Sequence, residues 1–519
     1  MHKSIYFLFI GLIISLSSCR KDFDTVPSSG NLQFSKDTIY LDTVFTNIGS
    51  STYTLKVYNR TNKDIQIPKI QLEKTDSKYR IMVDGMTGED EDKNGVGDGK
   101  IFNNVELLAK DSLFIFVETT ANSADANPTD FLYTDRILFD SGSNLQKVNL
   151  VTLIQDAYFL YPQKYEDGTK ETLLLGLDED SKEVRVNGFE LNENDPINGN
   201  EFRFTNDKPY VIYGYAGIPK GKTLTIDAGA RVHFHAESGI IAQPDSNLII
   251  NGEVSTDSSK PLQNEVIFEG DRLEPEYEYV TGQWGTVWLR EGSNANIKHL
   301  TIKNATVGLL MQNSTLTLND SQIYDCSNYG ILARVSKIVG KNNVLNSAGQ
   351  SCLAISIGGD YQFTHCTFNN NWNSTKQKAV LITNYEKNED ETITASDLIR
   401  ANFYNCIISG SNNVELFLDA IESVAFNYSF ESCLIQFNDF GTGIQKDTNY
   451  DFIRKEESGN IKNKDPKFYN LNLNRLNIDE TSAAFQKGNP AYRLAKDIMG
   501  VTRTSTPDIG AYQSAPFPE

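Results

Sequence analysis

The chain has 519 residues, enough for two or three domains of ordinary size. Its charged fraction of 22% and hydrophobic fraction of 39% are typical of a folded protein and exclude a largely disordered one. Lys and Arg number 48 against 68 Asp and Glu, and the net charge of −20 opposes nucleic acid and anionic lipid surfaces as partners.

The first 18 residues have the layout of a cleaved export signal. Lys3 precedes an apolar run over residues 5–16 that is too short to span a bilayer comfortably. The run ends in LSSC at residues 16–19, which resembles a bacterial lipobox. In such signals, cleavage leaves the cysteine as the new N-terminus, where it carries lipid. The resemblance implies lipidation of Cys19 and a membrane anchor without a spanning helix. An ordinary secretory signal with an incidental cysteine is the alternative.

Residues 19–30 are expected to form a short tether. Arg20 stands where some bacteria place an aspartate that retains lipoproteins in the inner membrane. The outer membrane is therefore favoured, with the protein either periplasmic or exposed on the cell surface.

Residues 31–155 alternate apolar and polar residues over short runs, separated by turn clusters about every ten residues. This pattern predicts an antiparallel β-sandwich. The stretch DTVFTNIGSSTYTLKVYNRTNKDIQIPKIQL resembles the immunoglobulin-like modules of exported bacterial proteins. Modules of that kind are spacers or docking units, so the resemblance implies the same role here.

An acidic loop within this domain, GEDEDKNGVGDGK at residues 88–100, predicts a weak structural Ca²⁺ site. Oxygen atoms at alternate positions of such a loop converge on a hard cation, and Gly95 stands where the tight turn is needed. The expected ligands are the side chains of Asp90, Asp92, Asn94 and Asp98 and the carbonyl of Val96. The loop is similar to those of thrombospondin type 3 repeats, but Ile101 replaces the bidentate Glu of an EF-hand. A solvated acidic loop without metal is the alternative.

Residues 156–209 are mixed and acidic, and are expected to form a connector and N-terminal cap. Residues 210–519 are expected to form a right-handed parallel β-helix with a C-terminal cap. They contain a repeated hexamer at 297–302, 318–323, 339–344, 363–368, 403–408 and 430–435. A period of 20–25 residues with several short strands per repeat indicates a solenoid of about ten coils. One helix is expected near the end of the chain, over residues 489–500.

A turn follows each hexamer, and its polar residues predict an asparagine ladder in which each side chain bonds to its neighbours in adjacent coils. Its members would be Asn304, Asp325, Asn346 and Asn370. The pattern breaks at Gly410 and Phe437.

Five cysteines remain beyond Cys19, and an odd number in an exported chain of this size does not indicate a disulfide framework. Cys366, Cys406 and Cys433 share the fourth place of the hexamer, with Leu300, Ser321 and Asn342 in earlier repeats. They are expected to be buried between coils as small hydrophobic groups, where neighbouring thiols could also pair. His365, one residue earlier, is expected to point the other way, to the surface.

Other residues suggest chemistry only weakly. His233 and His235 could share one strand face with Glu237 as a third metal ligand, but surface or stacked histidines are favoured. Trp284 and Trp288 would share a face and could contact a glycan, although core packing is favoured. The insertion at 272–283 could build a rim. Candidate carboxylates for glycoside hydrolysis are Asp320, Asp325, Asp360 and Glu415.

The segment NPAYRLAKDIMGVTRTSTPDIGAYQ, residues 489–513, resembles the closing segment of many exported bacterial β-helix proteins. Taken together, the chain resembles lipoproteins of Bacteroidetes-type bacteria that combine an immunoglobulin-like module with a right-handed β-helix. We expect a cell-envelope lipoprotein that presents the β-helix for binding or adhesion, with glycan as the partner. A polysaccharide lyase or glycoside hydrolase is the alternative, and the sequence settles neither activity nor oligomeric state.

Overall fold

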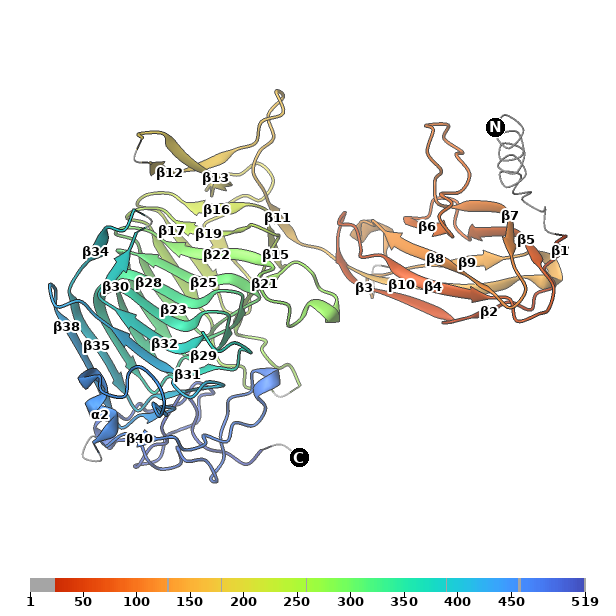
Figure 1. Cartoon of the computed structure of the whole chain (residues 1–519). Helices are drawn as coiled ribbons and strands as arrows, with labels where there is room; N and C mark the ends of the chain where they lie inside the picture. The colour runs from red at the N-terminus through yellow and green to blue at the C-terminus, as the bar shows by residue number, and fades with distance from the viewer. Residues whose placement is uncertain are drawn as a thin grey trace, which may run out of the picture. The chain divides into compact units, whose positions relative to one another are not determined.

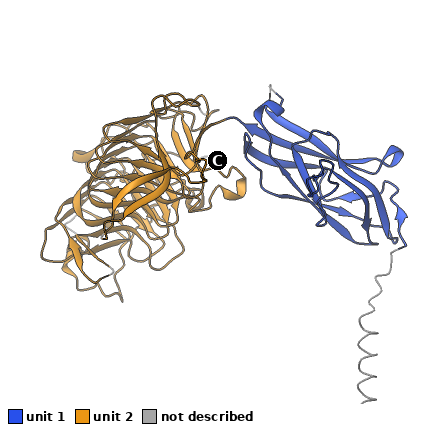
Figure 2. Cartoon of the chain, turned by 90° about the horizontal axis from the view of Figure 1, so that it is seen from above, with its two compact units in different colours: residues 1–156 blue, residues 157–519 orange. Residues whose placement is uncertain are grey.

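The computed structural model describes residues 24–127, 130–178, 180–257, 259–388, 390–455 and 459–517. It divides the chain into two compact units, residues 1–156 and 157–519 (Figure 2). The predicted all-β fold is confirmed, and one α-helix, α2 (Asp451–Arg454), occurs among the described residues. None of their helices is long and apolar enough to cross a membrane. Cys19 lies outside the described residues.

Unit 1 is a β-sandwich (Figure 1). Its six-stranded sheet comprises β1 (Val26–Pro27), β3 (Thr38–Phe45), β5 (Ile65–Leu72), β7 (Ile101–Leu107), β9 (Leu132–Phe139) and β10 (Gln146–Gln155). Its four-stranded sheet comprises β2 (Gln33–Phe34), β4 (Tyr53–Tyr58), β6 (Tyr79–Val83) and β8 (Ser112–Thr119). Buried and exposed residues alternate along β8 and β9, as the period of two predicts for strands with one buried face. The inner faces of both sheets supply one hydrophobic cluster.

Unit 2 is a parallel β-helix whose coils have three faces. The first face is an eleven-stranded parallel sheet. Its strands are β11 (Tyr158–Leu160), β15 (Tyr210–Ile212), β18 (Arg231–Phe234), β21 (Val266–Gly270), β24 (Leu300–Lys303), β27 (Gln322–Cys326), β29 (Val344–Ala348), β31 (Thr367–Asn370), β36 (Ile407–Gly410), β39 (Leu434–Ile435) and β40 (Ile461–Lys462). Its first strand lies in the segment 156–209.

The other two faces belong to one seventeen-stranded sheet, because β28 (Tyr329–Lys341) and β30 (Ser351–Thr364) each contribute to both. The second face contains β16 (Tyr215–Ile218), β19 (Gly239–Ala242), β22 (Trp284–Leu289), β25 (Ala305–Gln312), β32 (Lys378–Thr383) and β37 (Leu416–Asp419). The third contains β14 (Arg203–Phe204), β17 (Thr223–Asp227), β20 (Asn247–Asn251), β23 (Asn294–Lys298), β26 (Thr315–Asn319), β35 (Leu398–Tyr404) and β38 (Phe426–Glu431). Two hairpins are attached: β12 (Thr172–Leu177) with β13 (Glu183–Glu190), and β33 (Tyr385–Lys387) with β34 (Ile393–Ala395).

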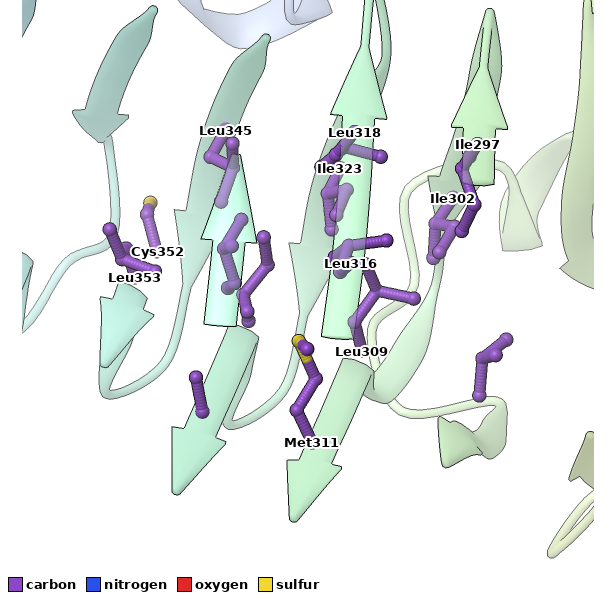
Figure 3. Close-up of a cluster of buried hydrophobic side chains, with 14 of the residues drawn as sticks. Ile297, Ile302, Leu309, Met311, Leu316, Leu318, Ile323, Leu345, Cys352 and Leu353 are labelled. Carbon is purple, nitrogen blue, oxygen red and sulfur yellow. The ribbon is translucent and has the colours of Figure 1, made fainter. Parts of the chain in front are cut away.

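The core of the β-helix is a stack of like side chains from successive coils. Ile302, Ile323, Leu345 and Phe368 occupy one place on the first face. Figure 3 shows the first three of them with inward residues of the other two faces. Aromatic rings stack in the same way, with 4.7 Å between the ring centroids of Phe403 and Phe430. Burial of these columns supplies the main driving force for coil stacking.

The third repeat is offset by one residue from the predicted register. The counterpart of Ser321 in the next coil is Asn343, which follows after 22 residues, whereas the sequence predicted an interval of 21. Asn343, and not Asn342, therefore shares the place of Cys366. At the turn after the hexamer, Ser347 and not Asn346 has the left-handed backbone of Asn304 and Asp325.

The predicted continuous asparagine ladder is wrong. Asn304 donates instead to the carbonyls of Glu278 and Val280 in the 272–283 insertion. Two predicted members do bond to the next coil, but to residues outside the predicted set: Asn369 Nδ2 donates to Asn346 Oδ1 at 2.8 Å, and Asp325 bonds to Ser347.

A different ladder runs inside the corner between the third and first faces, and we call it the inner ladder. Its members are Leu300, Ser321, Asn343, Cys366, Cys406, Cys433 and Asn460, and each backbone N–H donates to the side chain of the next member. The prediction that Cys366, Cys406 and Cys433 are buried between coils is confirmed, since all three are fully buried as free thiols. They serve as hydrogen-bond acceptors as well as fillers.

The residues just before the inner ladder form a second column on the outside of the same corner, the corner column. They all have positive φ angles: His299, Asp320, Asn342, His365, Asn405 and Ser432. The prediction that His365 lies on the surface is wrong. It points out of the core as expected, but the C-terminal segment covers it completely. Its Nδ1 lies 3.3 Å from the carbonyl of Gly510, and burial lowers its pKa to about 3.

The C-terminal segment packs along the outside of the first face. Its apolar residues Leu476, Ile478, Ile498 and Ile509 cover the outward residues Val344, Ile407 and Leu434. The helix predicted over 489–500 is wrong. This stretch lies against the β-helix as one 3₁₀ turn, η7 (Pro490–Tyr492), followed by irregular backbone with an isolated bridge at Lys496.

The run from Pro507 to Tyr512 is the docking element of this segment. Asp508 accepts hydrogen bonds from the backbone of Gln486 and Ser514. Gly510 has φ +96°, and a Cβ there would lie 2.7 Å from Ile407. Glycine is therefore required at this point of the fold.

Candidate functional site

The acidic loop of unit 1 brings three of its predicted metal ligands together. Carboxylate oxygens of Asp90, Asp92 and Asp98 all lie within 4.8 Å of one another, and no other group of His, Cys, Asp and Glu among the described residues meets that spacing. The amides of Asn94 and Gly95 donate to Asp90, and they lower its pKa. These bonds hold the loop in one conformation.

The donor set fits a hard cation, which prefers oxygen ligands. Asp90 and Asp98 are half-buried, whereas Asp92, Asn94 and Val96 are exposed, so any ion here would keep several waters. The loop thus brings oxygen donors together but leaves several of them exposed to solvent.

The histidines do not converge on a metal position. His233 is buried, with Nδ1 3.3 Å from the carbonyl of Gly270 and 3.7 Å from Glu269. His235 lies beyond the end of β18, where it pairs with Asp271 at 2.7 Å. Glu237 instead lies near Tyr215. Burial is the main cause of the raised pKa of Tyr215, and the charge of Glu237 adds to it.

The two tryptophans lie on opposite sides of their strand, so the prediction that they share a face is wrong. The register of β22 against β25 shifts between Thr286 and Val287, and this bulge reverses the alternation. Trp284 is 1% exposed and stacks on Phe234 at 4.3 Å, which excludes it as a glycan contact in the folded protein. Trp288 is half-buried and faces outward.

Trp288 belongs to an apolar row on the outside of the second face, which the sequence reasoning missed. The outer apolar row consists of Ile241, Trp288, Leu310, Leu332, Ala354, Leu381 and Phe417, paired from coil to coil. Trp288, Leu310, Leu332, Leu381 and Phe417 are half-buried rather than covered. The row could have been found by following one place through all coils, but the insertions hide that spacing.

A row of polar side chains runs beside it. Trp288 Nε1 donates to Gln312 Oε1 at 3.1 Å, and the guanidinium of Arg290 lies 5.5 Å from the Trp288 ring. Arg334 pairs with Glu386 on the β33–β34 hairpin. The second face thus offers a flat aromatic and aliphatic strip next to fixed amide and guanidinium groups, a composition that binding sites for uncharged organic ligands use.

The four candidate carboxylates are dispersed. Asp360 on the third face pairs with Arg400 at 2.8 Å, and Asp320 at the corner accepts from Asn342 at 2.9 Å. Asp325 on the first face accepts from Asn474 at 3.0 Å, while burial raises its pKa to about 6. These partners are structural, and the three residues lie apart: on the third face, at the corner and on the first face.

Glu415 is fully buried, and burial raises its pKa to about 7. Its oxygens accept from the amides of Asn412 at 2.6 Å and Ala379 at 2.8 Å. It thereby joins the start of β37 to β32 and has no access to a substrate. The four candidate carboxylates therefore do not converge on one site, as a glycoside hydrolase would require of them.

Comparisons with solved structures give weak likenesses. The catalytic unit of a GH87 α-1,3-glucanase from Streptomyces thermodiastaticus aligns with 11% identity and a TM-score of 0.28, covering 73% of this chain and 74% of that one. A family 123 glycoside hydrolase from Clostridium perfringens aligns with 6% identity and a TM-score of 0.17, covering 24% and 26%. The E. coli chaperone DraB aligns with 13% identity and a TM-score of 0.16, covering 25% of this chain and 57% of DraB. Scores this low assign no activity to this chain.

No curated protein matches the sequence. Residues 225–389 match a family model described as "Right handed beta helix region". That match falls within the parallel solenoid of unit 2, and the predicted right-handed parallel β-helix is confirmed.

Proposed function

We propose that this protein is a cell-envelope lipoprotein that binds glycan on the second face of its β-helix. The observation that carries the proposal is the outer apolar row beside Arg290, Gln312 and Arg334. The row is partly exposed and contiguous, which favours an interaction site, and Trp and Arg contribute most strongly to binding energy. A pyranose has an apolar ring face and a rim of hydroxyls, which complement a flat aromatic and neighbouring amide and guanidinium groups.

The net charge of −20 favours a neutral glycan over an anionic one as the ligand of this row. The hairpins β12–β13 and β33–β34 both contact the polar row, through Leu175 to Arg290 and through Glu386 to Arg334. The two hairpins would bound the outer apolar row at two points and so restrict the shape of the ligand that can bind there. Unit 1 would act as a spacer between the anchor at Cys19 and this surface.

The test is binding of a panel of neutral and acidic polysaccharides, with reducing ends and unsaturated products assayed in the same samples. Trp288→Ala should weaken binding of the best neutral ligand at least about tenfold, as expected when a central aromatic contact is lost. Phe440→Ala is the matched control, because Phe440 is an aromatic residue of the same unit with 85% exposure.

Equal binding by the Trp288→Ala and Phe440→Ala proteins would refute the proposed surface. Cleavage of any polysaccharide would instead favour the alternative of a carbohydrate-active enzyme. The anchor is tested separately: metabolic labelling with a radioactive fatty acid should mark the wild-type protein and not Cys19→Ser. Absence of label in the wild type would contradict lipidation.

We also propose that the acidic loop binds Ca²⁺ weakly, with Asp90, Asp92, Asn94, Asp98 and the carbonyl of Val96 as ligands. The proximity of three carboxylates supports this. The ion would serve to stiffen the loop at the base of β7.

A further inference from the structure

The outer apolar row keeps one place in every coil, although the sequence spacing of its members varies. From Trp288 to Phe417, each member is paired in parallel register with the member of the next coil. The β33–β34 hairpin lengthens one coil, but it follows β32 and leaves the pairing of β32 with β37 intact. Ala354, the smallest member, is buried, whereas the larger members from Trp288 onward are half-buried. The row is therefore evenly spaced and accessible along most of its length.

A polar residue accompanies each of these members at a fixed interval. The residue two places further along a strand points to the same side of the sheet, and in six successive coils that residue is polar. These residues make up the polar row: Arg290, Gln312, Arg334, Ser356, Thr383 and Asp419. All of them are half-buried, so each is in part accessible to a ligand. The second face thus repeats one combination, an apolar side chain beside a polar one, from coil to coil.

The charges of the polar row are balanced. Arg334 pairs with Glu386 of the β33–β34 hairpin, and Arg290 at one end of the row is matched by Asp419 at the other. Arg290 directs two of its N–H groups to protein acceptors, and Asp419 accepts from Tyr385 at 2.8 Å, which leaves hydrogen-bonding capacity in both groups. The row can therefore exchange hydrogen bonds with hydroxyl groups without favouring a ligand of either charge.

The repeat distance of the two rows matches that of an extended sugar chain. Neighbouring strands of a sheet lie about 4.8 Å apart, so the row from Trp288 to Phe417 spans roughly 24 Å. An extended chain of β-1,4-linked pyranoses advances by nearly the strand spacing for each sugar. Such a chain laid along the solenoid axis would place one ring over each coil. A chain of α-1,4-linked pyranoses instead winds into a helix, and its rings would leave the row after a few units.

We propose that the second face binds a linear, neutral glycan of the extended β-1,4-linked type, with its chain parallel to the solenoid axis and one sugar on each coil. Trp288 and Phe417 would stack on rings near the two ends of the bound stretch. Leu310, Leu332 and Leu381 would contact the rings between them, and the polar row would bond to their hydroxyls. This inference rests on the proposed glycan-binding function and specifies the class and length of its ligand.

The experiment measures, by isothermal titration calorimetry, the affinity for cello-, manno- and xylo-oligosaccharides of two to eight units. At least one series should gain at least about tenfold in affinity between two and six units and then level off, because further units extend beyond the row. Malto-oligosaccharides of the same lengths are the matched control, since they contain the same sugar as the cello series with the other linkage. Affinity that does not rise with length in any extended series, or an equal rise in the malto series, would overturn the inference.

Phe417→Leu tests the far end of the row. It removes the flat ring and keeps the apolar bulk, so the β-helix should remain folded. The variant should lose roughly threefold to tenfold in affinity for six-unit chains, and less for two-unit chains, because only a long chain contacts both Trp288 and Phe417. Phe440→Leu, at an aromatic residue of the same unit with 85% exposure, should bind as the wild type. Unchanged six-unit binding by Phe417→Leu would contradict the axial orientation.

The two proposals fail in different ways. If Trp288→Ala weakens a neutral polysaccharide while no extended series shows length dependence, the glycan-binding surface stands and its axial ligand is overturned. If Trp288→Ala binds every polysaccharide and oligosaccharide as the wild type does, the surface itself is overturned.

Discussion

Glu415→Gln should change how the stability of the protein depends on pH. Burial raises the pKa of Glu415 from 4.5 to about 7 in the folded chain. A carboxyl with a raised folded pKa stabilises the fold below the unfolded pKa, and that contribution is lost as pH rises through the folded pKa. The wild type should therefore lose stability between about pH 4.5 and pH 7.

The size of the effect follows from the shift. One pKa unit corresponds to about 1.4 kcal/mol, so ionisation of Glu415 costs the folded state about 3 kcal/mol by pH 8. The side-chain amide introduced by Glu415→Gln cannot ionise. In the wild type both carboxylate oxygens accept from backbone N–H groups, at Asn412 and Ala379, so the NH₂ group of the variant would face one of these donors and leave it without an acceptor. The variant should be less stable at pH 4.5 by about 1–3 kcal/mol, the cost of one unsatisfied buried donor.

Denaturant unfolding at pH 4.5 and pH 8 provides the measurement. The loss of unfolding free energy between these values should be about 3 kcal/mol smaller in Glu415→Gln than in the wild type. Glu422→Gln, at an exposed glutamate of the same unit, should behave as the wild type. An identical pH dependence in all three proteins would refute the reasoning.

Two further outcomes follow from the site description. Ca²⁺ at about 10 mM should raise the stability of unit 1 by about 1–3 kcal/mol if the loop binds in the submillimolar to millimolar range, and Asp92→Ala should abolish the rise in melting temperature. No rise in the wild type would remove the metal proposal. Trp284→Ala should cost about 3–5 kcal/mol of stability while folded protein keeps its glycan affinity; a selective loss of affinity would show that Trp284 contacts the ligand after all.

The β-helix could be predicted because its signal is repeated. The hexamers that end in Ile302, Ile323 and Phe368 place like residues at like positions, and each copy supports the others. The predicted register of the third repeat differs by one residue from the structure because nothing within a short apolar run determines which residue points inward. Val344 and Leu345 are equally apolar. Pairing with β27 and β31 determines which of them points inward.

The candidate sites were harder to predict because side-chain direction depends on local irregularities. A single irregularity in the pairing of β22 with β25 accompanies the burial of Trp284 and the outward direction of Trp288, and nothing in the spacing of four residues marks it. The sequence indicates that His365 points out of the core, but it does not show that the C-terminal segment covers this side chain. The proximity of Asp90, Asp92 and Asp98 could be predicted because these residues are close in sequence and the geometry of their loop is local.

The inner ladder gives the β-helix a direction of assembly. Each coil donates a backbone hydrogen to a side chain in the coil after it, as Cys366 does to Cys406 and Cys406 to Cys433. During synthesis, every newly made coil therefore presents this donor at its open end until the next coil covers it. The outward apolar residues of the first face stay uncovered longer, until Ile498 and Ile509 have been synthesised and pack against them. A nascent chain of this design stays dependent on its last residues, so shortening it should produce aggregation rather than a shorter β-helix.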